Sequence, residues 1–520
     1  MSHDVKKNKL LKKIIGLLGY KIVDKKSAQT ERLKQILSIN DQIFLIFVLS
    51  LIFGFTVQQF LLFKGNIAVL IHALEIFNDN KLQNDWTANQ TDHLPLFTLF
   101  NIFLIKFFST NILYLIHLIL LSLCSFFLFL ICKFVYPKLN SSNQILIWFS
   151  IFIVIFHENS FFSGVAGQRL IDAGYQPASY GVFFLLGIYF YLIDKNFVSI
   201  FFICLAASFH PTYIIHSGFL VSGFLIYYFW EKKLLDVFKL LSIYSLLILP
   251  ISAFVFLTFL NLDKEVTILG QEILLKRIPH HADIHYWLSY KDFISLAVYL
   301  ISLITIKNNK KLLIPMAVFG FCSVSISCFQ YFYEINSLAF MFPWRSSVFI
   351  MPISSMIIVS FLISKIKFVS NKKFFLYIIF FSISIFFGIK SHFIENLNSE
   401  FKKKIYLSNE IKKHYNSIES ILVPIDIESI RLNSGTPMFI NRKHHPFRMD
   451  EVIEWNSRIN LAKSFYSADN INKQKIIIEE ILQLENITHI LFKKKQFHPE
   501  CQNLINDNNF ILINISKCYN

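Results

Sequence analysis

The sequence predicts an α-helical polytopic membrane protein with a small C-terminal α/β domain. The chain of 520 residues is 54% hydrophobic and contains 59 Phe, whereas only 16% of its residues are charged. Several apolar runs reach the roughly 20 residues that a helix needs to cross about 30 Å of hydrocarbon. From residue 391 onward the composition becomes that of a soluble domain. These features exclude an ordinary soluble globular protein.

The apolar runs give about eleven transmembrane helices within residues 41–390. We predict spans at residues 43–63, 111–135, 143–156, 178–193, 240–260, 293–306, 312–331, 347–364 and 374–390, and two more within residues 197–230, where His210-Pro211 interrupts the run. Residues 1–40 form a basic, amphipathic segment, which the positive-inside rule places in the cytosol. The later lysines lie mainly in the short segments that this topology places in the cytosol. The formal charge of +16 is therefore a topology signal and not a nucleic-acid site.

This topology puts four loops outside the cell membrane, at residues 64–110, 157–177, 261–292 and 331–346. Within the first loop, residues 95–109 predict an amphipathic surface helix. Residues 391–520 then form an extracytoplasmic α/β domain, with strands at 421–426, 437–442, 488–493 and 510–516 and helices at 451–464 and 473–484. Cys501 and Cys518 lie in this domain, where an oxidising compartment would permit a disulfide.

The first external loop carries three aspartates, Asp79, Asp85 and Asp92. A carboxylate can accept the proton of an attacking hydroxyl group, so we predict Asp85 as a general base and Asp92 as the second choice. Asp79 is interpreted as a loop residue without a catalytic role. The alternative for each of the three is a solvated loop carboxylate.

Basic side chains gather in the other external segments, which suggests a phosphate-binding site. Arg277, His280 and His281 lie in one loop, and Arg169 and Arg345 lie next to spans. Guanidinium groups bind phosphate oxygens in a fork, and arginine near hydrocarbon is costly unless it pairs or binds an anion. His210, before Pro211, interrupts an apolar run and is a candidate substrate contact or a packing kink. We assign no metal ligand, although a divalent metal ion at the histidines is an alternative.

Several stretches resemble the GT-C superfamily of membrane glycosyltransferases, and in particular a poorly characterised bacterial GT-C-like family. The matching stretches are residues 277–282, the Arg169 segment before Tyr180-Gly181, the break at 208–211, and a tail motif around Arg431, Gly435, Phe439-Ile440, Glu454-Trp455 and Arg458. The resemblance implies a polyprenyl-phosphate-linked sugar donor, with a loop aspartate as base and arginines or histidines on the phosphate.

We therefore expect a glycosyltransferase of the bacterial inner membrane that transfers a sugar to an envelope glycan, lipid or protein on the extracytoplasmic face. Its expected partners are the lipid-linked donor, membrane lipids and the acceptor, without nucleic acid. The alternatives are a polysaccharide polymerase, a lipid-linked-sugar flippase or transporter, and a non-catalytic envelope scaffold. A flippase needs charges along a path through the bilayer, and the spans contain few.

Overall fold

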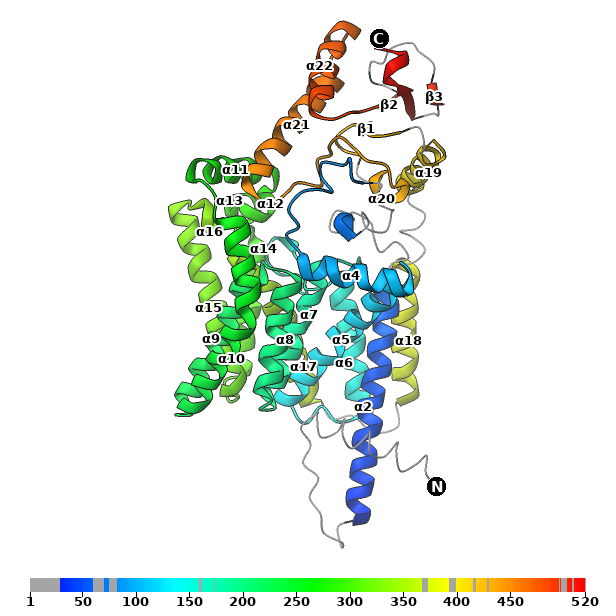
Figure 1. The fold of residues 1–520 in the computed structure, drawn as a ribbon. Helices are drawn as coiled ribbons and strands as arrows, with labels where there is room; N and C mark the ends of the chain where they lie inside the picture. Colours follow the sequence, from blue (N-terminus) through cyan, green and yellow to red (C-terminus); the bar gives the residue numbers. More distant parts are fainter. Residues whose placement is uncertain are drawn as a thin grey trace.

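A computed structural model gives the fold as a helical membrane part with a small sheet-containing domain at one end (Figure 1). The structure describes residues 29–58, 70–73, 82–158, 161–172, 174–366, 373–391, 399–414, 418–427, 430–494, 496, 503–506 and 509–519. The predicted Asp79 and Cys501 lie outside the described residues.

Apolar helices of 11 to 29 residues make up the membrane part. In chain order they are α2 (Gln29–Val57), α4 (Pro95–Phe108), α5 (Ile112–Val135), α6 (Ser142–Glu158), α7 (Val182–Leu192), α8 (Asn196–Phe209), α9 (Tyr213–Trp230), α10 (Leu234–Val255), α14 (Tyr290–Thr305), α15 (Lys310–Tyr333), α17 (Ser347–Lys365) and α18 (Lys373–Ile389). Short helical segments join them: η2 (Val165–Gly167), η3 (Pro177–Gly181), η4 (Phe256–Leu260), α11 (Lys264–Arg277), α12 (Pro279–Ala282), α13 (Ile284–Trp287), α16 (Asn336–Ala339) and η5 (Pro343–Ser346).

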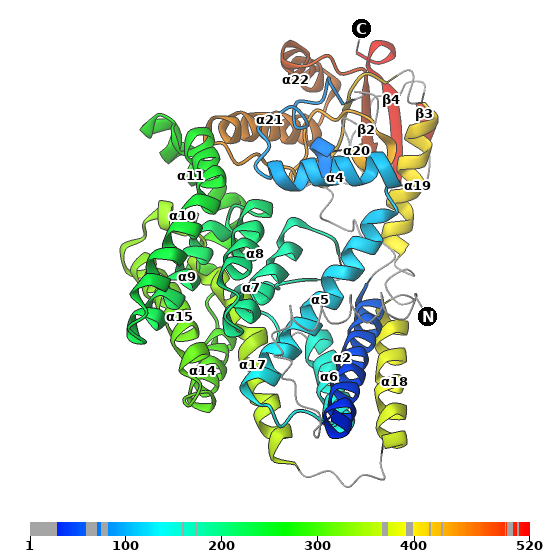
Figure 2. The same cartoon turned by 60° about the horizontal axis from the view of Figure 1, so that its bottom comes forward.

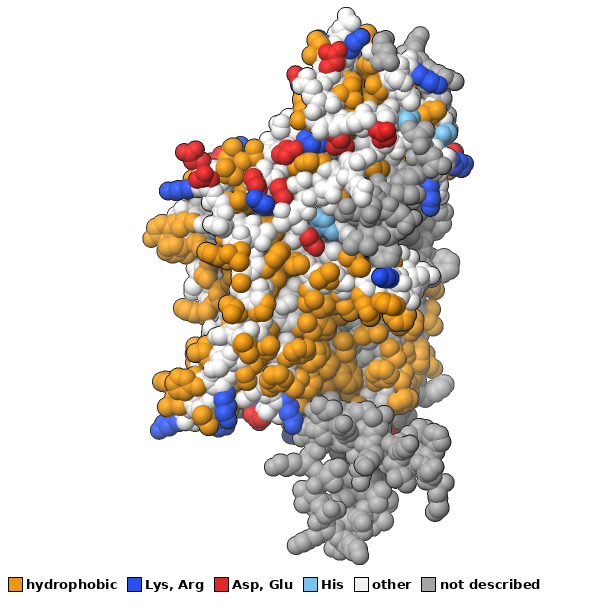
Figure 3. Space-filling view, in the orientation of Figure 1, with side chains coloured by type: hydrophobic (Ala, Val, Ile, Leu, Met, Phe, Trp, Pro, Cys, Tyr) orange, Lys and Arg blue, Asp and Glu red, His pale blue; other side chains and the backbone are white. Residues whose placement is uncertain are grey.

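Five helical stretches are long and apolar enough to cross a membrane. They are Ile112–Val135, Tyr213–Trp230, Leu234–Leu260, Lys310–Tyr333 and Asn336–Lys365, and six shorter apolar helices accompany them. On the face shown in Figure 3, a broad hydrophobic band covers this part, with charged side chains above and below it. The prediction of a helical membrane protein is confirmed at this level, whereas the number of eleven spans stays a prediction.

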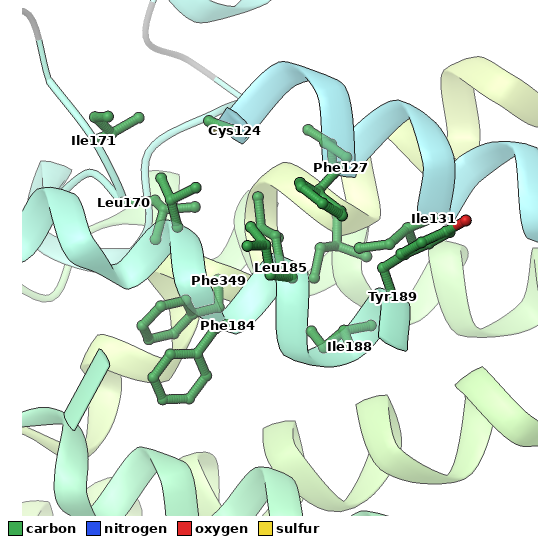
Figure 4. Close-up of a cluster of buried hydrophobic side chains, with 14 of the residues drawn as sticks. Cys124, Phe127, Ile131, Leu170, Ile171, Phe184, Leu185, Ile188, Tyr189 and Phe349 are labelled. Atoms are coloured by element: carbon green, nitrogen blue, oxygen red, sulfur yellow. The ribbon is translucent and has the colours of Figure 1, made fainter. Parts of the chain in front are cut away.

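The helices pack through large apolar side chains. In the cluster of Figure 4, side chains of α5 such as Phe127 meet side chains of α7, and Phe184 stacks on Phe349 of α17 with ring centroids 4.3 Å apart. Helices α2, α6 and α18 stand side by side at the edge of the bundle (Figure 2). Where α9 crosses α15, a Cβ atom at Gly223 would lie only 2.6 Å from the Cα of Pro315. Glycine therefore permits this close approach.

The apolar run between residues 197 and 230 is broken where the sequence predicts. Helix α8 ends at Phe209 and α9 begins at Tyr213, so His210-Pro211 forms the connection. Proline lacks an N–H group and cannot continue the ladder of α8. The backbone of the break is hydrogen-bonded locally, because Tyr213 N donates to His210 O and Ile214 N donates to Pro211 O.

The C-terminal domain contains a four-stranded sheet with a hydrophobic cluster on each face. Its elements are α19 (Ser399–Lys413), β1 (Ile421–Leu422), α20 (Ile430–Ser434), α21 (Met449–Ser467), α22 (Ile471–Leu484), β2 (His489–Lys493), β3 (Asn503–Asn506), β4 (Phe510–Asn514) and η9 (Ile515–Lys517). The strand order is β1-β2-β4-β3, with β1 parallel to β2 and the other pairs antiparallel.

Alternate residues of β2 and β4 face opposite sides of the sheet, as a strand requires. Ile490 and Phe492 join the core beside α21 and α22, whereas Leu491 joins the core on the other side. The predicted strand at 437–442 is wrong, because this segment makes only a single bridge, between Met438 and Ile421. Its backbone instead turns toward the first loop, where Met438 N donates to Asp85.

A buried ion pair joins the first loop to the C-terminal domain. The side chains of Asp85 and Arg431 are both fully buried, and Arg431 Nε donates to Asp85 Oδ2. Met438 N donates to the same oxygen at 2.9 Å, and Ala88 N donates to Oδ1 at 2.9 Å. The remaining guanidinium nitrogens of Arg431 contact His444 Nδ1 and the Met438 carbonyl. All these groups are satisfied, which is the condition under which a buried charge pair can be tolerated.

We expect Arg431→Ala to destabilise the docked C-terminal domain by about 3–5 kcal/mol, because it leaves the Asp85 carboxylate buried without a counter-charge. Thermal unfolding in detergent, read together with limited proteolysis of the C-terminal domain, measures this loss. Lys473→Ala removes one partner of an exposed pair with Asp469 and should leave both readouts unchanged. Equal behaviour of the two variants would contradict the anchoring role of the buried pair.

Candidate functional site

Three segments that connect apolar helices and the break before α9 line an open cavity of about 580 Å³. It lies at the junction between the membrane helices and the C-terminal domain. The lining residues are Ala166, Gly167, Gln168, Arg169, Asp172, Gln176, Ala178, His210, Tyr213, His281, Arg345 and Val348. Four predicted phosphate-binding residues, Arg169, His210, His281 and Arg345, are therefore brought together from distant parts of the sequence.

Arg345 is the cation at the centre of this site. It lies in η5, directly before α17, and its Nε donates to Gln168 Oε1 at 3.0 Å. Its Nη1 donates to Thr212 Oγ1 at 3.0 Å, and its guanidinium lies 4.4 Å from the Phe342 ring centre. No carboxylate of the described residues forms an ion pair with it. The charge of Arg345 is thus held by neutral groups and remains available to an anion.

Arg169 supplies a second guanidinium with a different environment. Its Nη1 donates to Asp172 Oδ1 at 3.3 Å, and its Nη2 donates to the Phe156 carbonyl at 3.2 Å. The Asp172 side chain is 53% exposed, so this pair is weakened by solvent. The cavity therefore contains one paired arginine and one arginine with only neutral partners.

Two histidines complete the polar wall. His281 Nδ1 lies 2.8 Å from Gln168 Nε2, and His210 Nδ1 lies 3.0 Å from Thr212 Oγ1. Burial, reinforced by the positive charge of Arg345, lowers the pKa of His281 to about 3 and holds the pKa of His210 well below its usual range. Both imidazoles are consequently neutral near pH 7.

Two other predicted phosphate ligands lie outside the cavity lining. Arg277 Nε donates to the Arg442 carbonyl at 2.8 Å, which ties α11 to the C-terminal domain. The His280 ring contacts the His281 ring at a tilt of 44°, with centroids 4.1 Å apart. Burial and the charges of Arg277 and Lys443 lower the pKa of His280. These residues border the site through His281 and do not line the cavity.

The predicted catalytic aspartates also lie away from the cavity lining. Asp85 is the buried anchor described above, and both of its oxygens accept hydrogen bonds. Asp92 Oδ1 accepts from Leu94 N at 2.8 Å at the start of α4. These contacts favour structural roles for both carboxylates, and their assignment as catalytic bases stays a prediction.

Sequence reasoning missed Gln168 and Thr212 as site residues. Thr212 and Arg345 are 133 positions apart, and neither the glutamine nor the threonine stands out in the sequence by charge. Their neighbours Arg169 and His210 were the available signal. Among the described residues, no group of three or more His, Cys, Asp or Glu side chains is placed to hold a metal ion.

The fold and site together define a helical membrane protein with a basic cavity beneath a small sheet-containing domain. Family-model and curated-protein searches give no match to this chain. The function is therefore argued from the site itself.

The layer between the cavity and the C-terminal domain contains further buried histidines, including His93 and His445. Burial lowers the pKa of each to about 3. Because these values lie below the usual value of 6.5, the unfolded chain binds more protons between pH 6.5 and pH 3. Stability is therefore fully present above pH 6.5 and is lost as the pH falls.

We expect His445→Phe to reduce this acid sensitivity by up to about 1.4 kcal/mol per pH unit. Neither ring nitrogen of His445 forms a well-aligned hydrogen bond, although the Lys443 backbone is close enough to oppose part of the pKa shift. Phenylalanine should thus be tolerated at pH 7. The measurement is the melting temperature between pH 7.5 and pH 4.5.

The adjacent His444 provides the matched control. Its Nδ1 is contacted by Arg431 Nη1 at 2.7 Å and by Asn441 Nδ2 at 3.1 Å. His444→Phe should therefore cost about 1–3 kcal/mol already at pH 7, because two buried donors lose their acceptor. An acid sensitivity that is the same in wild type and His445→Phe would contradict the contribution of His445.

Proposed function

We propose that the protein is a membrane glycosyltransferase that binds the phosphate of a polyprenyl-phosphate-linked sugar in the cavity and transfers the sugar to an acceptor. The observation that carries the proposal is the guanidinium of Arg345. It lines a cavity at the end of the membrane helices, is held only by neutral partners, and has two neutral imidazoles beside it. An anion is the ligand that such a donor set favours.

The chemistry requires a group that stabilises the phosphate as it leaves the sugar. Preorganised donors in a site with little water stabilise developing negative charge more strongly than water does. Arg345 and Arg169 supply the cations, and His210 and His281 supply neutral ring nitrogens. The apolar helices around the cavity would keep the polyprenyl chain in the bilayer.

For the proton of the attacking hydroxyl we propose Asp172 as acceptor. It is the carboxylate among the lining residues, and its side chain is half exposed. The sequence-based choice, Asp85, accepts hydrogen bonds from Arg431, Met438 and Ala88, which leaves its oxygens poorly suited to take a proton. The assignment to Asp172 predicts that activity and stability depend on different aspartates.

We further propose that the C-terminal domain is extracytoplasmic and the N-terminus cytosolic, in a bacterial inner membrane. The alternation of lysines between the spans supports this orientation. Cys518 is disulfide-bonded, and structural disulfides persist in oxidising compartments. The envelope acceptor would then meet the cavity from outside the cell.

The test compares variants for binding and transfer with lipid-linked sugars extracted from the source membranes. Arg345→Ala should reduce transfer about 100-fold, because it removes a charged donor to the leaving phosphate. Arg277→Ala should have a smaller effect, because Arg277 contacts the Arg442 carbonyl outside the lining. Purified variants in proteoliposomes, with products analysed by mass spectrometry, give the measurement.

The aspartates separate catalysis from anchoring. Asp172→Asn should abolish transfer while leaving the melting temperature close to wild type, whereas Asp85→Asn should lower the melting temperature. Transfer that survives Asp172→Asn and Arg345→Ala would contradict the proposal. Movement of intact lipid-linked sugar between leaflets would indicate a flippase, and a lack of any lipid-phosphate binding would indicate a scaffold.

A further inference from the structure

The hydrogen bonds around Arg345 decide which nitrogen of His281 carries the hydrogen. An arginine nitrogen can only donate, so the Gln168 atom at 3.0 Å from Arg345 Nε must be the carbonyl oxygen. The amide nitrogen of Gln168 therefore faces His281 Nδ1, at 2.8 Å. Because an amide nitrogen donates, Nδ1 must accept, and the hydrogen of His281 lies on Nε2.

His210 is joined to the same arginine through Thr212. Arg345 Nη1 donates to the hydroxyl oxygen of Thr212, at 3.0 Å. This oxygen also lies 3.0 Å from Nδ1 of His210, and its hydroxyl hydrogen can donate to that nitrogen. His210 carries its hydrogen on Nε2 in the arrangement in which Thr212 donates. One arginine thus contacts two histidines through two neutral side chains and sets the tautomer of His281.

The hydrogen bond from Gln168 requires a neutral His281 ring, since an imidazolium has no lone pair with which to accept. The groups around His281 also favour the neutral ring, because they lower its pKa. Besides burial, they are the cations Arg345 and Lys443 and the imidazoles His280 and His445. Each would raise the cost of a positive charge on His281.

The groups around His210 come from other elements, and they also lower its pKa. Arg345 is its neighbouring cation, and His93 and His216 face it from the first loop and from α9. Asp172, the carboxylate among the residues that line the cavity, pairs with Arg169. The cavity wall therefore disfavours imidazolium at both positions.

We propose that Gln168 and Thr212 are positioning residues that hold His281 and His210 as neutral Nε2–H donors toward the phosphate. This inference rests on the proposed binding of a phosphate-bearing ligand in the cavity. The anion would then be bound by fixed arginine charges and by two N–H dipoles, without uptake of a proton. A site that relied on imidazolium would instead lose donors as the pH rises through the usual histidine pKa of about 6.5.

The first experiment is calorimetric titration of the detergent-solubilised protein with the methyl ester of a short-chain isoprenyl phosphate. This phosphodiester keeps one negative charge throughout the tested range of pH 5.5–8. The expected result is an unchanged dissociation constant and an enthalpy that does not depend on the ionisation enthalpy of the buffer. Affinity that falls tenfold or more toward pH 8, with proton uptake on binding, would overturn the inference.

Substitutions of Gln168 test the tautomer directly. In Gln168→Glu the carboxylate can still accept from Arg345 but can no longer donate to His281, so it favours a hydrogen on Nδ1 and raises the His281 pKa. Affinity should then decrease as the pH rises from 5.5 to 8. Gln176→Glu places the same charge in the same cavity and should lower affinity equally at every pH. A pH-independent Gln168→Glu variant would overturn the role of Gln168.

Substitutions of Thr212 test the second positioning residue. Thr212→Val should weaken the affinity about tenfold, because Arg345 and His210 both lose a partner, and Thr212→Ser should restore it. An unchanged Thr212→Val variant would overturn the role of Thr212. If instead the wild-type protein does not bind the probe, or binds it equally well after Arg345→Ala, the proposed function itself fails.

Discussion

The buried pair of Asp85 and Arg431 is the contact on which the position of the C-terminal domain depends. It joins the loop that follows the first apolar helix to the C-terminal domain, and the two residues are 346 positions apart in the sequence. A carboxylate and a guanidinium lose much hydration when they are buried, so they are tolerated only if every remaining donor and acceptor finds a partner. Backbone groups of Ala88 and Met438 complete this set. The docking geometry is therefore specified by hydrogen bonds as well as by charge.

The two buried arginine environments show how the same side chain can serve structure or binding. Arg431 pairs with the Asp85 carboxylate, which neutralises its charge within the fold. Arg345 faces Gln168 and Thr212, which orient the guanidinium without neutralising it. A cation that remains uncompensated costs stability unless a ligand supplies the missing charge. The contrast assigns Arg431 to the anchor and Arg345 to the cavity.

The sequence is sufficient to predict those features that depend on local composition. The apolar runs, the break at His210-Pro211, helices α21 and α22, and strands β1, β2 and β4 follow from hydrophobic pattern and from the missing N–H of proline. Arg169, His210, His281 and Arg345 were identified because charge and imidazole are unusual next to apolar helices. The structure brings these four residues together in one cavity.

Other features could not be predicted because they depend on tertiary partners. An aspartate in a polar loop looks exposed in sequence, and nothing near Asp85 indicates that Arg431 will bury it. Gln168 and Thr212 are ordinary polar residues whose importance arises only from their bonds to Arg345. Segment 437–442 has the composition of a strand, yet its backbone is used by Asp85 and by a single bridge to β1. In each case a distant partner decides the role.

The anchor and the cavity are physically connected through the histidines between them. His445 and Lys443 of the C-terminal domain affect the His281 pKa, and His93 of the first loop affects that of His210. The Asp85–Arg431 anchor holds the C-terminal domain, and with it His445 and Lys443, close to His281. Docking therefore contributes to the electrostatic surroundings that favour a neutral His281, although neither residue of the anchor lines the cavity.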